Sequence, residues 1–442
     1  MNQTILPDLP PFPNSKEKLL ENIKSMTILA GTSSSLPKFQ ALSSCIPTLD
    51  SATPISSVIV IDIGGTATKV GVRMHNQSLD WQILIEEPND SFEDSTLPVN
   101  SLERFAAMVA KRITTQINKL REIDTHWALG IVWSNAMQNS LIKNIGIDGN
   151  IINRARYSKA EWFNQDTKDE DSIGQIFLKA FNKSGINISL YLVANDTPLT
   201  MKALKTANAG MVVSTGLNAT VVKKSSSGPI ICNAEMGTSF FLDKEFIHPE
   251  DFIAENKPAS IIEHLVSGKN LPRLFASHIM ANTHQYGEVC TLSKYFKSIG
   301  PNAYEFFTAQ DLANCLERPH DFLTKTRSSL DFDLNALKYY QALCRSIIIR
   351  AARLSSLFAY AAVFEQFTEK NHFIIALDSS LSRGIPLFCQ TFQESLNEIT
   401  PKGKSIKLEL IDRLEVPGGI ISVPMQGAAN ALDALSAQFE SV

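Results

Sequence analysis

The fold is decided by Val58-Ile59-Val60-Ile61-Asp62-Ile63-Gly64-Gly65-Thr66, continued by Ala67-Thr68-Lys69-Val70-Gly71-Val72. A β-branched run leads into Asp-x-Gly-Gly-Thr and then into a second apolar alternation, which predicts a strand, a tight turn and a strand. Glycine in the turn can adopt positive φ and leaves the backbone amides open to a ligand. Consecutive amides of this kind bind anions, so the hairpin is a candidate phosphate site; the alternative is a core hairpin whose glycines only turn.

Three polar side chains accompany this turn. Thr66 offers a hydroxyl donor and Lys69 a cation, and Asp62, at the end of the first strand, offers a carboxylate that can face a phosphate-bound Mg²⁺.

Length and composition indicate two globular lobes, and they give no sign of nucleic acid or an anionic membrane as a partner. A chain of 442 residues exceeds one ordinary core and predicts two lobes of roughly 200 residues each. Apolar residues make up 44%, and the net charge of -4 gives no reason to expect nucleic acid or an anionic membrane as partner. The longest apolar stretch, around 354–364, is shorter than the ~20 residues that a transmembrane helix needs. The N-terminus lacks the pattern of a secretory signal.

Cysteine and histidine are dispersed along the chain. The 6 cysteines form no close pair, which predicts buried thiols and a reducing, cytoplasmic location. The 8 histidines include no His-Glu-x-x-His spacing, so metal hydrolase chemistry is not expected.

Changes in residue composition along the chain divide it into four parts. Residues 1–14 carry four prolines and are expected to form a solvated tail. Residues 15–54 are interpreted as an N-terminal helix and a linker, with 31–57 lying on the surface of the first lobe. The small lobe is expected at 55–205 and the large lobe at 206–442, with the C-terminal helix a candidate to return to the small lobe.

Strands and helices alternate, which predicts an α/β fold. The expected strands are 127–133, 189–194 and 373–377, and the expected helices are 101–120, 173–181, 198–207, 346–364, 388–399 and 425–437. A second hairpin, 210–214 and 220–223 around Thr215-Gly216, repeats the opening one, so we expect two related halves that close on one nucleotide.

Polar residues at strand ends carry the predicted chemistry. Asp196, within Asn195-Asp196-Thr197, follows a strand and can accept the proton of an attacking hydroxyl; alternatively this segment only caps the next helix. Three further sets of amides and carboxylates suit the hydroxyls of a polyol. They are Ser134-Asn135, Asn218, and Asn233-Ala234-Glu235-Met236-Gly237.

In order and spacing these motifs resemble those of the hexokinases over nearly the whole chain. The matching segments are 35–39, 62–66, 130–138, 157–159, 195–197, 215–219, 233–237 and 262–268. The resemblance implies a two-lobed actin-like ATPase (ribonuclease H-like) fold of the hexokinase type, with a cleft between small and large domains. It also implies transfer of the γ-phosphoryl of Mg·ATP to the 6-hydroxyl of a hexose, most simply D-glucose, as the first step of glycolysis.

The same resemblance assigns residues to roles. Asp196 would be the general base, and Lys159 would lie near the transferring phosphoryl group. The residues that would hold the sugar are Ser134, Ser158, Lys159, Asn195, Asp196, Asn218, Glu235 and Glu263. Those that would bind the nucleotide are Asp62, Gly64, Gly65, Thr66, Lys69, Thr215, Gly216, Asp378 and Ser380, with Asp62 acting on Mg²⁺ indirectly. Lobe closure on the sugar would complete the site.

Departures from the family pattern cluster on the nucleotide side. Ala67 stands in place of Asn, Ser214 in place of Gly and Leu217 in place of Thr. Ser379 also stands in place of Gly, at a position where positive φ is expected and where serine adopts it less readily than glycine. An alternative is therefore a hexokinase-like sugar sensor with weak or lost turnover. A non-sugar actin-like ATPase would leave the strand-end Asn and Glu set unexplained. The preferred hexose, the phosphoryl donor and the oligomeric state stay open.

Overall fold

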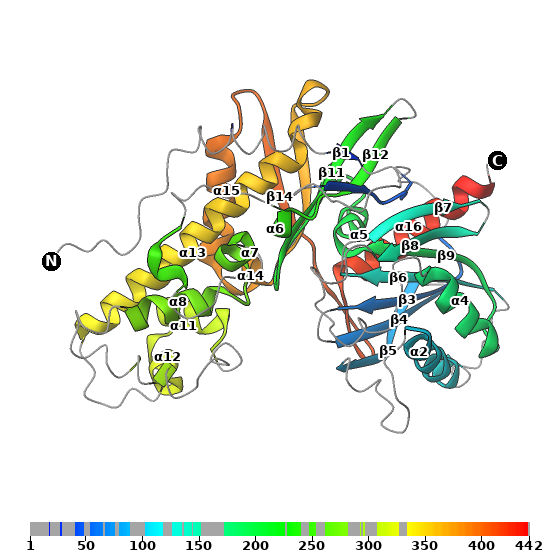
Figure 1. The fold of residues 1–442 in the computed structure, drawn as a ribbon, viewed down its shortest axis with the longest axis horizontal. Helices are drawn as coiled ribbons and strands as arrows, with labels where there is room; N and C mark the ends of the chain where they lie inside the picture. Colours follow the sequence, from blue (N-terminus) through cyan, green and yellow to red (C-terminus); the bar gives the residue numbers. More distant parts are fainter. Residues whose placement is uncertain are drawn as a thin grey trace.

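The computed structural model has two α/β lobes that meet near the middle of the molecule (Figure 1). It describes residues 17, 27–28, 40–47, 54–64, 67–75, 79–88, 102–117, 126–134, 137–143, 145–151, 172–225, 228–239, 247–252, 261–281, 292, 295–296, 307–326 and 334–440. Within these ranges each lobe is built on one seven-stranded sheet. The expected two-lobed α/β class is confirmed, and nearly all of the expected N-terminal helix lies outside the described residues.

The small-lobe sheet places the opening hairpin at its centre. Its order is β5 (Leu79–Pro88), β4 (Ala67–His75), β3 (Ser57–Ile63), β6 (Trp127–Trp133), β9 (Ile188–Asn195), β8 (Gly146–Ile151) and β7 (Met137–Ile142). β3 and β4 pair antiparallel, whereas β3, β6 and β9 run parallel. The carboxyl ends of three central strands therefore meet at one edge, where ligands bind in open α/β sheets.

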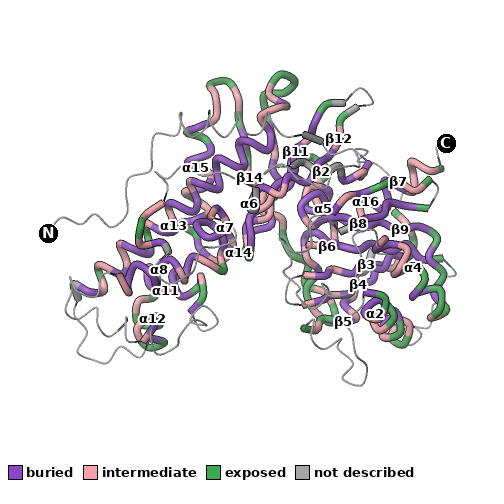
Figure 2. Tube along the Cα trace, in the orientation of Figure 1, coloured by how far each residue is buried: buried purple, intermediate pink, exposed green. Residues whose placement is uncertain are grey.

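Both faces of this sheet are covered, which explains the unbroken apolar run in β3. Ile59 and Ile61 pack against α2 (Leu102–Ile117) and α4 (Ile173–Lys183). Val58 and Val60 face the other way, against the C-terminal helix α16 (Val423–Glu440). A strand buried on both faces is continuously hydrophobic, and Figure 2 shows β3 and β6 buried along their length.

The large-lobe sheet repeats the same arrangement. Its order is β1 (Thr27–Ile28), β2 (Gln40–Ser43), β12 (Gly228–Asn233), β11 (Leu217–Ser225), β10 (Ala209–Val213), β13 (His372–Asp378) and β14 (Ser405–Leu410). The run β12-β11-β10-β13-β14 has the order and strand directions of β5-β4-β3-β6-β9. The two related halves expected from the repeated hairpin are therefore present in the backbone topology.

Helices fill the rest of the large lobe. They are α6 (Met236–Ser239), η4 (Pro249–Phe252), α7 (Ile261–Val266), α8 (Leu271–Ala281), α11 (Ala309–Glu317), α12 (Pro319–Lys325), α13 (Leu334–Val363), η6 (Phe364–Thr368), α14 (Ser380–Gly384) and α15 (Pro386–Ile399). α13 begins well before the expected residue 346. With η6 it is long and apolar enough to cross a membrane, contrary to the expectation from sequence, but 83% of its most apolar window is buried within the protein.

Near each end of the described chain, one segment packs with the lobe that is farther from it in sequence. The segment expected on the surface of the first lobe instead supplies β2, which pairs with β12 in the large-lobe sheet. α16 crosses to the small lobe and packs on β3 and β6 (Figure 1). Before it, the hairpin of β15 (Leu414–Val416) and β16 (Gly419–Ile421) lies beside β5, where Ile83 N–H donates to the Pro417 carbonyl at 3.0 Å.

Elements from both lobes pack closely against the backbone of helix α5 (Asp196–Ala203), because each has a glycine at the contact. A Cβ on Gly210, in β10, would lie 2.5 Å from the Thr197 carbonyl oxygen. A Cβ on Gly427, in α16, would lie 1.7 Å from the Leu199 carbonyl oxygen. Both distances are far below van der Waals contact, so these positions require glycine because backbones approach closely. The first residue of α5 is Asp196, so the position of this carboxylate depends on both lobes.

We predict that Gly427→Ala destabilises the protein by more than about 3 kcal/mol, because the new methyl group must push α16 away from the α5 backbone. Urea denaturation followed by circular dichroism measures the loss. Gly384→Ala is the matched control, since its Cβ would meet only the end of the Gln310 side chain at 3.3 Å. Equal stabilities of the two variants would contradict the proposed close approach.

Candidate active site

Two predicted site residues lie where β9 ends and α5 begins. Asn195 caps the helix, and its Oδ1 accepts the Thr197 N–H and the Thr197 hydroxyl, both at 3.0 Å. Its Nδ2 donates to the Trp133 carbonyl at 3.2 Å, which ties the end of β9 to the end of β6. Asp196 accepts the Thr197 hydroxyl at 3.2 Å and sits in the first turn, where a helix favours negative charge. The capping role expected as an alternative therefore holds for Asn195 and leaves Asp196 as the candidate base.

The sugar-side residues of the large lobe converge through a chain of hydrogen bonds. Asn218, near the start of β11, donates from Nδ2 to Asn233 Oδ1 at 2.8 Å. Asn233, at the end of β12, donates in turn to Glu235 Oε1 at 2.6 Å. Glu263 approaches from α7, and its Oε1 accepts the Leu217 N–H at 3.4 Å. The structure thus joins Asn218 and Glu235 through Asn233, which sequence reasoning quoted in its motif but did not assign to the site, and adds Glu263 beside β11.

The backbone of Glu235 has an uncommon conformation. Its φ is 47°, in the left-handed region that favours glycine. Two residues on, a Cβ at Gly237 would lie 2.3 Å from the Leu217 carbonyl and 2.8 Å from Glu263 Oε1. Strained or crowded backbone of this kind persists where the surrounding structure holds it, and often does so at binding sites. Here it fixes the directions of two carboxylates, on Glu235 and Glu263.

The small-lobe part of the predicted sugar site is described only in part. Ser134 directly follows β6 and is half-buried next to the end of β9. Ser158 and Lys159 lie outside the described residues, as do Gly65 and Thr66 of the opening turn.

Three carboxylates approach one another on the nucleotide side. Asp62, near the end of β3, accepts the Ser422 hydroxyl at 2.6 Å. Burial raises the pKa of Asp62 to about 6, and the charges of Asp196 and Asp378 raise it further, against the opposing effects of Ser422 and Lys69. These groups come from the ends of β3, β9 and β13, so both lobes contribute negative charge to the same region. Such a region favours a bound cation.

Two glycines of the predicted phosphate turns do not use left-handed backbone. Gly64 and Gly216 are absent from the positive-φ residues of the described chain, whereas Gly65 and Thr66 lie outside the described residues. In the second turn the Ser214 N–H donates to the Gly216 carbonyl at 2.9 Å, and Thr215 is exposed. Lys69 lies opposite Asp62 in the β3–β4 pair and forms an ion pair with Glu86 at 2.7 Å.

The adenosine-side residues also differ from expectation. Ser379 does not need positive φ: its φ is -142°, and it caps α14 by accepting the Ser382 N–H at 2.9 Å. Ser380 is exposed in the first turn of that helix. Asp378 is bound by Arg383 at 2.6 Å and by Arg413 at 3.5 Å. Sequence reasoning missed both arginines, because no local motif connects them to Asp378.

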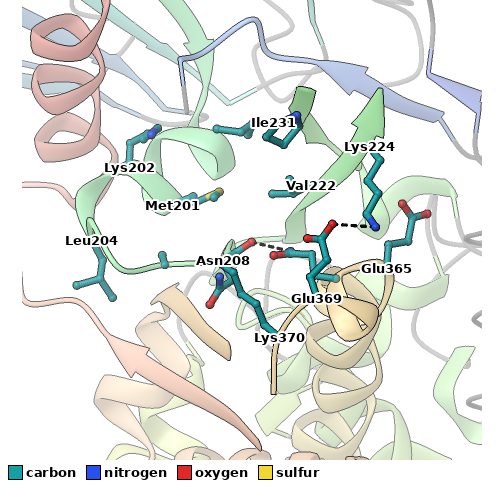
Figure 3. Close-up of a pocket in the computed structure, with 13 residues that line it drawn as sticks. Met201, Lys202, Leu204, Asn208, Val222, Lys224, Ile231, Glu365, Glu369 and Lys370 are labelled. Carbon is teal, nitrogen blue, oxygen red and sulfur yellow. Dashed lines mark hydrogen bonds and ion pairs between the residues drawn. The ribbon is translucent and has the colours of Figure 1, made fainter. Parts of the chain in front are cut away.

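A separate pocket of about 440 Å³ lies at the other end of α5 (Figure 3). Met201, Val222 and Ile231 supply apolar walls, and the ion pair of Lys224 with Glu369, at 2.8 Å, also lines the pocket. This pocket is formed by the carboxyl end of the helix whose first residue is Asp196, so it is distinct from the predicted sugar and nucleotide residues.

We predict that Asp62→Asn stabilises the protein at neutral pH and not in acid. The folded-state pKa of about 6 lies above the ordinary value of 3.8, so ionised Asp62 opposes folding. This penalty is absent below about pH 4, grows between pH 4 and 6, and is complete above pH 6, where it amounts to on the order of 3 kcal/mol. Urea denaturation at pH 7.5 and pH 4 measures it. The exposed Asp412→Asn serves as control, and a gain independent of pH would contradict the assignment.

Comparisons with known proteins agree with this arrangement. Residues 208–421 match the family model described as hexokinase. No curated protein matches the chain. Among solved structures, a hexokinase from Schistosoma mansoni complexed with glucose superposes with a TM-score of 0.71 at 16% identity, over 96% of this chain and 95% of that one. A second hexokinase crystal structure superposes with a TM-score of 0.73 at 16% identity, over 96% and 94%.

At that identity the structural likeness establishes the fold. Residues 208–421, just under half of the chain, match the hexokinase family, and almost the whole chain has the two-lobed actin-like ATPase fold of hexokinases.

Proposed function

We propose that this chain is a cytoplasmic kinase that transfers the γ-phosphoryl of ATP to the 6-hydroxyl of a hexose, with D-glucose the first candidate. One observation carries the proposal. Asp196 is the first residue of a helix held by both lobes, close enough to Asp62 and its cation-attracting surroundings to raise the pKa of that residue. A general base is needed where a sugar bound by the lobes would meet the phosphates.

The chemistry assigned to Asp196 is a proton transfer. Its carboxylate accepts the proton of the 6-hydroxyl as the sugar oxygen attacks the γ-phosphorus, and ADP leaves with the electron pair of the broken bond. Little covalent work remains for the protein, so positioning and charge stabilisation supply most of the rate. Asn195 supports this role because its cap and its bond to Trp133 fix the start of α5.

The large-lobe network is proposed to hold the other sugar hydroxyls. Asn218 and Asn233 orient Glu235, whose carboxylate can accept two vicinal hydroxyls, and Glu263 approaches from the opposite side. Water is too small to bridge these groups and the small lobe together, so a sugar-dependent closure would protect ATP from hydrolysis.

The carboxylate set fits a magnesium nucleotide. Asp62 and Asp196 would face Mg²⁺ through bound water or phosphate, and the ion would offset the charge of the β- and γ-phosphates. The fit rests on the approach of Asp62 and Asp196: burial is the main cause of the raised pKa of Asp62, and the charge of Asp196 adds to it.

A second candidate function is a sugar sensor with weak or no turnover. Two observations favour it. Lys69, the cation expected to bind the phosphates, forms an ion pair with Glu86 instead. Leu217 stands where the family has a threonine, so a hydroxyl donor is missing. A sensor has no need for Asp62 and Asp196 to lie in the same electrostatic environment, and for that reason we prefer the kinase.

We predict that Asp196→Ala lowers the turnover number with glucose and Mg·ATP by about 10²-fold or more, the range contributed by a positioned base. A coupled assay for glucose 6-phosphate measures turnover, with Asp412→Ala as control. Glucose should still raise the melting temperature of the variant. Retention of more than a few per cent of activity would remove Asp196 as base, and a wild-type protein that binds glucose without turnover would favour the sensor.

We predict that Glu235→Gln raises the KM for glucose about 10- to 100-fold, because a sugar hydroxyl loses its charged acceptor at a cost of roughly 1–3 kcal/mol. The KM for ATP should change much less. The exposed Glu394→Gln, on α15, controls for the loss of a charge. An unchanged KM for glucose would exclude Glu235 from the sugar site.

A further inference from the structure

Two histidines and a glutamate gather in the large lobe, apart from the proposed active site. His248 and Glu250 lie at the start of η4, and His278 lies in α8. His278 Nδ1 is 3.0 Å from Glu250 Oε2, and His248 Nδ1 is 3.9 Å from the same oxygen. The two imidazole rings have centroids 5.0 Å apart, and one ligand atom from each residue lies within 4.8 Å of the others.

A buried carboxylate fixes the orientation of His278. Its Nε2 lies 2.9 Å from Asp251 Oδ1, and Asp251 also accepts two bonds from Arg350, at 3.0 and 2.8 Å. The Arg350 guanidinium can only donate, so Asp251 accepts both of these bonds, and we assign His278 Nε2–H as the donor of the third. This carboxylate–histidine pair is the arrangement that orients histidine ligands at metal sites.

The orientation leaves His278 Nδ1 facing a second carboxylate. In a neutral ring this atom carries a lone pair, which repels the Glu250 oxygen 3.0 Å away unless a cation lies between them. A proton on Nδ1 would join His278 to Glu250, whereas a metal ion would also bind His248, whose Nδ1 accepts the Glu250 N–H and so carries a lone pair. The metal would replace the contact of His248 Nδ1 with the Glu250 N–H, at 3.2 Å.

We propose that His248, Glu250 and His278 bind one Zn²⁺ ion. Two imidazoles and one carboxylate form a ligand set that Zn²⁺ prefers. A tetrahedral zinc with bonds near 2.1 Å needs ligand atoms about 3.4 Å apart, and the two separations of 3.0 and 3.9 Å lie on either side of that value. His278 is 1% exposed, whereas His248 and Glu250 are 21% and 27% exposed, so a water molecule can complete the fourth position from the open side.

The ion would link η4 to α8 and so restrain the segment between Glu235 and Glu263, two residues of the proposed sugar site. η4 lies in sequence between Glu235 and Glu263. The Asp251 carbonyl also interacts with His264 Nε2 at 2.8 Å, and His264 directly follows Glu263. Zinc bound here would thus stiffen the support of Glu263 without touching the reacting groups. The metal site itself does not depend on the proposed kinase activity.

The test uses the full chain without an affinity tag, stripped with a chelator, loaded with Zn²⁺ and freed of excess metal. We expect about one zinc per chain by elemental analysis and a melting temperature raised by several degrees over the stripped protein. Co²⁺ in place of Zn²⁺ should give the intense visible absorption of a four-coordinate site.

The decisive comparison is between two histidine variants. His248→Gln removes one partly exposed ligand, leaves the bonds of Asp251 to His278 and Arg350 in place, and should weaken zinc binding about tenfold or more. His126→Gln, at an exposed histidine bonded to Asn187, should bind zinc as the wild type does. No zinc retained by the wild type, or equal retention by His248→Gln, would overturn the proposal and leave His278 as a hydrogen-bond partner of Glu250 and Asp251.

Discussion

The arrangement of this protein depends on one steric constraint, the close approach of α5 to a strand of one lobe and a helix of the other. The α5 backbone fits only because Gly210 and Gly427 have no side chains, with hypothetical Cβ atoms 2.5 and 1.7 Å from its carbonyl oxygens. Neither β10 nor α16 can shift far along α5 without a clash, so the two lobes are related through this helix. Asp196, its first residue, keeps its place relative to both lobes, whereas groups on the outer strands can move.

Charge sets the second requirement of the structure. Burial is the main cause of the raised pKa of Asp62, and the nearby charges of Asp196 and Asp378 add to it. Two other buried acids of this chain have a fixed cation beside them: Arg350 pairs with Asp251, and Arg383 with Asp378. Asp62 instead accepts the Ser422 hydroxyl. Under the proposed function, a bound magnesium ion would compensate the charge of Asp62.

Much of the fold could be predicted wherever burial produces a recognisable local pattern in the sequence. The strand 127–133 matches β6 because both faces of that strand are covered, and the Asn195-Asp196-Thr197 segment identifies the start of α5 because its cap is local. Features set by distant contacts could not be predicted. β2 joins the large-lobe sheet through pairing with β12, and Arg413 reaches Asp378 only after the chain has folded. Positive φ was expected as an option for the glycines of the opening turn; Gly64 does not adopt it, and a Cβ there would lie 3.1 Å from the Ala67 carbonyl oxygen, whereas Gly65 lies outside the described residues.

The repeated strand order of the two sheets has a consequence for how the lobes can move. α5 follows β9, the fifth strand of the repeat in the small lobe, and α16 comes after β14, the fifth strand of the repeat in the large lobe. Two corresponding helices therefore cross at the junction, as they would at the two-fold axis of a symmetric dimer. Their side chains have lost that symmetry, since one helix begins with a catalytic candidate and the other follows Ser422, which serves Asp62. A rotation about the crossing preserves the contact between the helices, so twisting of the lobes about this internal axis is the movement that disturbs the packing least.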